Sequence, residues 1–333
     1  MNDSADPFEA RGWKAHRKIV SVLGSRISLE ANHRGLLALA ASAFDGLPAH
    51  RMGDARRLRL VLKCTSDPSA QRWRRPPAPR LASGDGFLMS AFDPANFALV
   101  SPRQHAALVH VSPDALRFPY HLRYELIEFA GLMLAARVRQ LIPLHAACVM
   151  RRGRTFLLLG DSGAGKSTLC LAAGLAGFEL LSEDSVFVTA GDLCATGVAN
   201  FLHVEREGLR FVEDVAVRRA LGAAPTIERR SGIRKLEIDL RTGALPVARR
   251  AAPLTAVIVL SSRRATSAPL LRPLGSAGML RALRASQGYA RLRTGWQTFE
   301  RNLARLPAYL LERGAHPREG AEALLVLARG RGS

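Results

Sequence analysis

The sequence predicts an α/β protein with a smaller β-rich N-terminal domain over residues 1–125 and a larger domain with a mixed sheet over residues 126–333. Two observations predict this division. Residues 17–125 contain short apolar segments without sustained helical spacing, as is typical of strands. Helical spacing begins near Tyr124, and strand and helix candidates are both found beyond it, which is typical of an α/β fold.

The strands expected in the N-terminal domain are short and mostly apolar. Leu58–Cys64, Phe97–Val100 and Ala107–Val111 each fit a strand. No internal repeat and no catalytic pattern of residues is visible in this domain. The sequence therefore assigns it no role.

A helix and a β-hairpin are expected at the start of the larger domain. Apolar residues from Leu126 to Val138 recur at three- and four-residue steps, and Pro143 ends the helical pattern. Leu144–Met150 and Thr155–Leu159 are strand candidates joined by a charged turn. Because the turn is short, we expect the two strands to pair antiparallel.

The segment after this hairpin matches the phosphate-binding motif G-x-x-x-x-G-K-[ST], with a helix-compatible stretch behind it. The glycines let the backbone curl so that N–H groups point at phosphates, and the helix N-terminus adds partial positive charge. Lys166 is expected to reach the β- and γ-phosphates of ATP, and the Ser167 hydroxyl to coordinate Mg²⁺. The expected nucleotide-binding residues are Gly160, Asp161, Ser162, Gly163, Ala164, Gly165, Lys166, Ser167 and Thr168.

Two adjacent carboxylates, Glu183 and Asp184, follow the strand candidate Phe178–Leu181. At a strand end beyond the loop they are well placed to face the same phosphates. Since side chains alternate along a strand, the two need not point the same way. One is expected to hold Mg²⁺ and the other to accept a proton from an attacking hydroxyl; an exposed acidic turn is the alternative. The expected hairpin also brings His145 toward the loop, where it has either a catalytic or a structural role.

The formal net charge is +20, but its distribution argues against a nucleic-acid partner. There is no block of like charges and no basic run interleaved with aromatic residues, so a solvated basic surface is expected. Only five of the 48 basic residues are lysines. Besides Lys166, the lysine to suspect of contacting phosphates is Lys235, with a solvated strand-end cation as the alternative.

Three elements in this order resemble the catalytic domain of bacterial HPr serine kinase/phosphorylase and its relatives, over residues 140–260. They are Leu144–Ala147 with His145, the loop Gly160–Ser167 and the segment Ser182–Asp184 with its acidic pair. The resemblance implies the phosphate-loop core with a mixed sheet that this family shares with the ATP-dependent phosphoenolpyruvate carboxykinases. It also implies ATP and Mg²⁺ as cofactors. In this interpretation Glu183 is the base, Asp184 assists with the metal and His145 supports phosphoryl transfer. Apart from the resemblance, the residues themselves make Ser167 a candidate metal ligand and Lys235 a candidate catalytic residue.

The chain departs from that pattern at three positions. Glu183 stands where the family usually has aspartate, and Thr168 where HPr enzymes usually have an acidic residue. The segment Val204–Leu209 matches the E-x-R-G-x-G signature poorly. The chain resembles more closely the divergent relatives found with lasso-peptide maturation enzymes, which implies a serine of a peptide or protein as the phosphoryl acceptor.

Two alternatives stay open: a small-molecule kinase or carboxykinase-like enzyme, and a non-catalytic nucleotide-dependent regulatory protein. The four scattered cysteines and the polar N-terminus predict a reduced, cytoplasmic protein. No uninterrupted apolar run of about 18 residues exists, so no membrane partner is expected. A homo-oligomer is compatible with the sequence.

Overall fold

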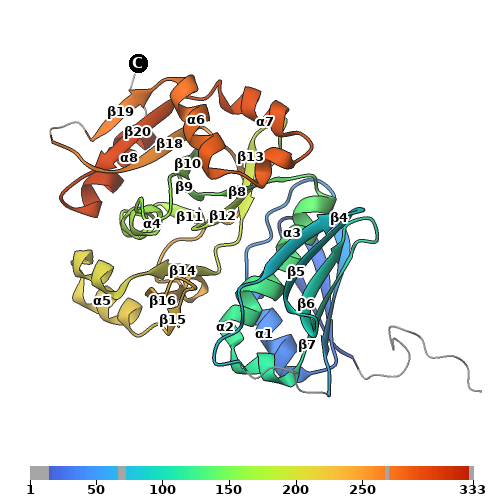
Figure 1. Cartoon of the computed structure of the whole chain (residues 1–333). Coiled ribbons are helices and arrows are strands. Elements are labelled where there is room, and N and C mark those ends of the chain that lie inside the picture. Colours follow the sequence, from blue (N-terminus) through green and yellow to red (C-terminus); the bar gives the residue numbers. More distant parts are fainter. Residues whose placement is uncertain (1–14, 67–72, 267–269, 330–333) are drawn as a thin grey trace, which may run out of the picture. The chain divides into compact units, whose positions relative to one another are not determined.

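The computed structural model describes residues 15–66, 73–266 and 270–329. The chain divides into two compact units, one of Met1–Asp45 with Asp54–Val138 and one of Gly46–Gly53 with Arg139–Ser333. Figure 1 labels many of the elements of both units. In the part of the chain that is described, no helix combines the length and apolar character needed to cross a membrane.

The first unit is built on one seven-stranded sheet. Its strands are β1 (His16–Val22), β2 (Ser25–Ala31), β3 (Arg56–Cys64), β4 (Arg80–Gly84), β5 (Phe87–Asp93), β6 (Asn96–Ser101) and β7 (Ala106–Val111). They lie in the order β1-β2-β3-β7-β6-β5-β4. β3 pairs parallel with β2 and β7, and the other neighbours pair antiparallel. The expected β-rich character of this region is therefore present.

The helices of the first unit are α1 (Arg34–Phe44), η1 (Pro113–Arg117), α2 (Pro119–His121), η2 (Leu122–Glu128) and α3 (Phe129–Val138). The helix expected from the spacing after Leu126 is present as α3, preceded by the π-helical η2. α3 buries Ala130 and Leu134 and contacts β6 and β7 of the first sheet. The division between the units accordingly follows Val138, whereas the sequence predicts it at residue 125.

The described residues of the second unit form three sheets. Its strands are β8 (Ile142–His145), β9 (Ala147–Arg151), β10 (Arg154–Leu159), β11 (Glu179–Ser182), β12 (Ser185–Val188), β13 (Cys194–Gly197), β14 (Phe201–Val204), β15 (Thr226–Glu228), β16 (Arg234–Asp239), β17 (Ala252–Pro253), β18 (Ala256–Arg264), β19 (Leu271–Leu274) and β20 (Ala308–Arg313). The sheets have the orders β11-β9-β10-β18-β20-β19, β17-β13-β12-β8 and β14-β16-β15. β10, β18 and β20 run parallel, so the largest sheet is mixed, as expected.

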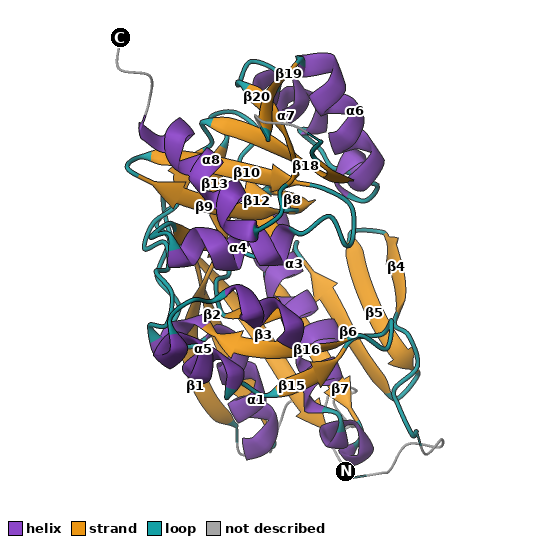
Figure 2. Cartoon of the chain, turned by 90° about the vertical axis from the view of Figure 1, so that its left-hand side faces the viewer, coloured by secondary structure: helices purple, strands orange, loops and turns teal. Residues whose placement is uncertain are grey.

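The helices of this unit are α4 (Lys166–Leu175), η3 (Arg206–Phe211), α5 (Val215–Gly222), η4 (Leu240–Thr242), α6 (Ser276–Ser286), η5 (Ala290–Leu292), α7 (Trp296–Leu303) and α8 (Pro317–Arg329). Figure 2 shows them in a second view. The residue spacing from Trp296 to Leu311 predicts helical structure with an interruption at Pro307, but α7 ends at Leu303 and β20 begins at Ala308. That part of the prediction is wrong because Ala308–Leu311 pairs parallel with β18.

The hairpin before the glycine-rich loop is present as β9 and β10, which pair antiparallel. Its two turn residues, Arg152 and Gly153, have φ of 51° and 75°. Two consecutive left-handed residues match the right-handed twist of hairpin strands. The single strand predicted over Leu144–Met150 is interrupted at Ala146, so that β8 and β9 belong to different sheets.

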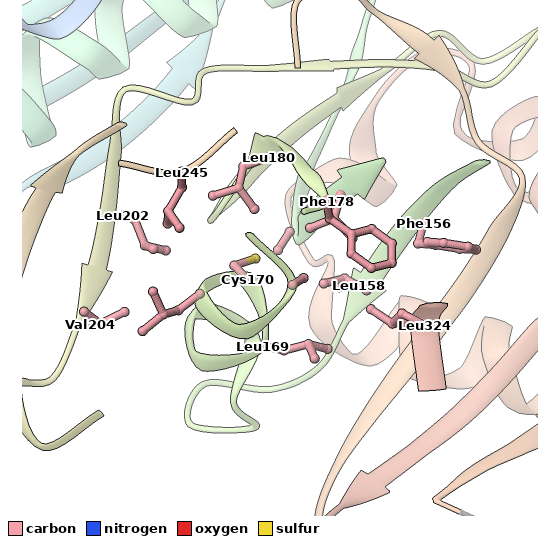
Figure 3. Close-up of a cluster of buried hydrophobic side chains, with 14 of the residues drawn as sticks. Phe156, Leu158, Leu169, Cys170, Phe178, Leu180, Leu202, Val204, Leu245 and Leu324 are labelled. Carbon is pink, nitrogen blue, oxygen red and sulfur yellow. The ribbon is translucent and has the colours of Figure 1, made fainter. Parts of the chain in front are cut away.

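Alternate residues of β10 enter two separate hydrophobic cores. Phe156 and Leu158 pack in the cluster that also holds Leu169 of α4 and Leu324 of α8, drawn in Figure 3. Leu157 and Leu159 pack in a second cluster together with buried residues of α6 and α7. A strand buried on both faces is a rigid base for the loop that follows it.

Gly197 of β13 fixes the position of the segment that leads into Glu183. A Cβ atom at this position would lie 2.6 Å from the Cβ of Ser182 and 2.7 Å from the carbonyl oxygen of Leu181. Gly197→Ala should therefore destabilise the protein by about 1–3 kcal/mol through overpacking.

The matched control is Gly191→Ala, because apart from Gly191 and its two chain neighbours no heavy atom of the described chain lies within 4 Å of a Cβ there. Its effect should stay within about 0.5 kcal/mol. Chemical unfolding of both variants checks the prediction. Equal stability of the two would contradict the close approach of β13 to β11.

Candidate functional site

The loop that joins β10 to α4 has the backbone conformation its glycines were expected to permit. Gly163 and Gly165 have φ of 82° and 98°, in the left-handed region, and Gly165 directly precedes α4. At Gly160, a Cβ would lie 3.0 Å from the Cβ of Ala164 and 3.2 Å from that of Leu260. The loop thus closes tightly at its base and leads directly into the first turn of α4. The backbone N–H groups of a first helical turn have no carbonyl partner within the helix and can bind phosphate.

Lys166 lies inside this loop. Its side chain is buried, and Nζ donates hydrogen bonds to the carbonyl oxygens of Gly160 at 2.6 Å and Asp161 at 3.2 Å. Burial lowers the pKa of Lys166, and the nearby carboxylates of Asp184 and Glu183 oppose part of this shift. A phosphate would offer this amine stronger, charged acceptors than the two carbonyl groups.

The two carboxylates after β11 lie in different environments. Glu183 is 6% exposed, and its Oε1 accepts a hydrogen bond from the Ser167 hydroxyl. The Asp184 side chain is 26% exposed, and its Oδ1 lies 3.1 Å from Nδ1 of His145. The turn between β11 and β12 is closed by Ser182, whose hydroxyl donates to the Ser185 carbonyl oxygen at 2.7 Å. Adjacent acids therefore have separate partners, one on the loop side and one on the His145 side.

His145 ends β8 and pairs in register with Ser185 of β12. Its side chain is 48% exposed, but its backbone is held on both sides by the buried Gln287. The His145 N–H donates to Oε1 of Gln287 at 2.8 Å, and Nε2 of Gln287 donates to the His145 carbonyl oxygen at 3.0 Å. Gln287 follows α6, so this helix end fixes the strand that carries His145.

Two residues that the sequence analysis missed complete the site. They are His203 of β14 and Glu237 of β16. They pair in register across the three-stranded sheet. Nδ1 of His203 lies 3.3 Å from Oε2 of Glu183, and Nε2 lies 3.1 Å from Oε1 of Glu237. All three side chains are less than one-tenth exposed. The buried imidazole of His203 therefore lies between the carboxylates of Glu183 and Glu237, and it holds the Glu183 carboxylate that contacts Ser167.

Burial alone would lower the pKa of His203, but hydrogen bonds to Glu183 and Glu237 outweigh burial, and the pKa is raised. In the protonated form both ring nitrogens donate, which satisfies both neighbouring carboxylates. A weak sequence signal exists only for Glu237. It alternates with the buried apolar Leu236 and Ile238 and therefore lies on the other face of β16.

Lys235 also lies on β16, where it pairs in register with Ile227 of β15. Its side chain is half-buried. Among the described residues, no hydrogen bond or ion pair joins Lys235 to the loop. Its expected contact with phosphates therefore stays a prediction, whereas the loop, Glu183, Asp184 and His145 are connected by the contacts given above.

The site offers hard oxygen donors for a cation. The Ser167 hydroxyl and the Glu183 carboxylate lie together, and Asp184 is the next residue. Within the described residues, no group of three or more His, Cys, Asp or Glu side chains is arranged to hold a metal ion. Mg²⁺ in phosphoryl-transfer sites is held by one or two protein oxygens together with substrate phosphates and water, and the residues present fit that chemistry.

Comparisons with known proteins found similarity among solved structures alone. No family model and no curated protein matches the chain. Among solved structures it is similar to the Hpr(Ser) kinase/phosphatase from Coxiella burnetii, with 14% identity and a TM-score of 0.29. The match covers 56% of this chain and 95% of that chain. At this TM-score the match carries no weight for individual residues, and family membership stays a prediction.

The raised pKa of His203 predicts a pH-dependent contribution to stability. The pKa of His203 in the folded state lies above its value of about 6.5 in the unfolded chain. The stability that this difference contributes is fully present below about pH 6.5 and is lost as the pH rises through the folded-state pKa. The free energy of unfolding of the parent should therefore exceed that of His203→Gln by more at about pH 6 than at about pH 9. Chemical unfolding of both proteins across this range tests it. A difference that does not change with pH would contradict the protonated bridge.

Proposed function

We propose that the second unit is an ATP- and Mg²⁺-dependent kinase that transfers the γ-phosphoryl group to a serine hydroxyl of a peptide or protein. The proposal depends on one observation, which is that the two acids beside the loop differ in burial and in partners. Glu183 is buried against Ser167, and Asp184 is partly exposed against His145. A phosphate-binding loop, a metal-side acid and a solvent-side acid are the parts that phosphoryl transfer to a hydroxyl needs.

Glu183 is assigned the role of a metal ligand. Ser167 at the start of α4 and Glu183 would hold Mg²⁺, which neutralises charge on the β- and γ-phosphates when bound. His203 and Glu237 keep the Glu183 carboxylate turned toward Ser167. Lys166 would exchange its two carbonyl partners for phosphate oxygens.

The base role is assigned to Asp184, because the acceptor hydroxyl must arrive from solvent. Asp184 takes the proton of the serine hydroxyl as the serine oxygen bonds to the γ-phosphorus. The bond from that phosphorus to the bridging oxygen breaks, and ADP leaves. His145, held by Gln287, orients the Asp184 carboxylate through the 3.1 Å contact. This division of roles is the reverse of the one that the sequence resemblance implies, in which Glu183 is the base.

A pair of isosteric substitutions separates the two assignments. Asp184→Asn should keep Mg·ATP binding and lower phosphoryl transfer about 10²- to 10⁴-fold, the usual contribution of a general base. Glu183→Gln should instead weaken the Mg²⁺-dependent part of ATP binding, because an amide oxygen is a poorer ligand for a hard cation. Calorimetric titration with ATP, with and without Mg²⁺, gives the affinities.

Transfer is measured with γ-labelled ATP and a library of serine-containing peptides, with a library carrying alanine in place of serine as the control. The opposite pattern, in which Glu183→Gln loses transfer alone and Asp184→Asn loses binding, would return the base role to Glu183. If both variants match the parent in Mg·ATP binding and transfer, neither acid serves the reaction. Parental ATP binding without transfer to either library would contradict the serine-kinase proposal and favour one of the two alternative functions.

A further inference from the structure

A cavity of about 460 Å³ lies along α4, and its lining includes Thr168 of the phosphate-binding motif. One of its walls is a single face of the helix, formed by Thr168, Leu171 and Leu175 at three- and four-residue steps. The segment from Phe211 to Asp214 and the start of α8 line the other sides. Its volume is within the range of small-molecule sites, roughly 300–1,000 Å³.

The cavity reaches the last residue of the phosphate-binding motif. Thr168 lines the cavity and is the last residue of the motif, directly after Ser167. β10 and β20 both run parallel to β18, so their carboxyl ends lie at one edge of the sheet. The loop follows β10 there, and the segment with His316 follows β20. Ligands of α/β sheets bind outside this edge.

The lining suits a flat group with apolar faces and a polar edge. Leu175 is 41% exposed, although it is a large apolar residue, and Leu171 lies one helical turn before it. The rings of Phe211 and His316 are in T-shaped contact, with centroids 4.9 Å apart. Glu213, an exposed carboxylate of the lining, pairs with Arg318 at 3.0 Å, and its carboxylate oxygens can accept a further hydrogen bond from an amino group. Apolar side chains with a few polar groups are the usual lining of a small-molecule site.

We propose that this cavity holds the purine base of the nucleotide whose phosphates bind the loop. The proposal rests on the proposed function and deepens it, since it names the part of the nucleotide that the loop motif cannot recognise. The triphosphate lies along the loop and passes the first turn of α4 at Thr168. The base then packs against Leu171 and Leu175, with its amino edge toward Glu213.

The test compares ATP with inorganic tripolyphosphate, which offers the phosphates without the base. Calorimetric titration in Mg²⁺ uses the full chain, Leu175→Ala and Phe211→Ala. We expect the parent to bind ATP at least about ten-fold more tightly than tripolyphosphate, because tripolyphosphate lacks the base that packs in the cavity. Each variant should lose about ten-fold in ATP affinity and keep its tripolyphosphate affinity.

Val326→Ala is the matched control, because Val326 is 67% exposed on α8 and is not among the cavity residues. It should leave both affinities unchanged. Equal affinity of the parent for ATP and tripolyphosphate would overturn the base site while leaving the phosphate site intact. Variants that keep ATP affinity but lose transfer to serine peptides would overturn it in favour of a peptide site. If the parent binds neither ligand, the proposed function itself fails.

Discussion

A carboxylate buried to 6% exposure needs hydrogen-bond partners for both oxygens, and the partners of Glu183 come from two distant segments. Ser167 begins α4, and His203 lies on β14. His203 is held in turn by Glu237 of β16. One buried side chain thus ties the phosphate-binding loop, the turn after β11 and the three-stranded sheet together. Removing one member would take one hydrogen bond from a buried neighbour, which is why such networks fix a geometry closely.

The same turn gives two adjacent acids opposite chemical settings. Glu183 is enclosed between a hydroxyl and an imidazole, whereas Asp184 remains accessible beside His145. Both settings depend on elements remote in sequence, because Gln287 after α6 clamps the backbone of His145. Pairs of titratable groups whose environments differ in this way are the usual source of separate metal-binding and proton-transfer roles in one site.

The sequence predicts the local parts of this arrangement and misses the long-range ones. The loop, its flanking strand and helix and the β9–β10 hairpin are set by glycines and apolar runs over a few residues. His203 and Glu237 meet only because β14 and β16 pair in one register, which no short motif encodes. Ala308–Leu311 has an apolar pattern that fits a helix or a strand, and pairing with β18 decides the outcome.

The central claim is that the Gly160–Thr168 loop binds the phosphates of a nucleotide through Lys166 and the first turn of α4. Calorimetric titration of the full chain and of Lys166→Ala with Mg·ATP tests it most directly. The account predicts binding by the parent and loss of most of the affinity in the variant, because the buried ammonium group is the cation that gathers the β- and γ-phosphates. Equal Mg·ATP affinity in the two proteins would contradict it.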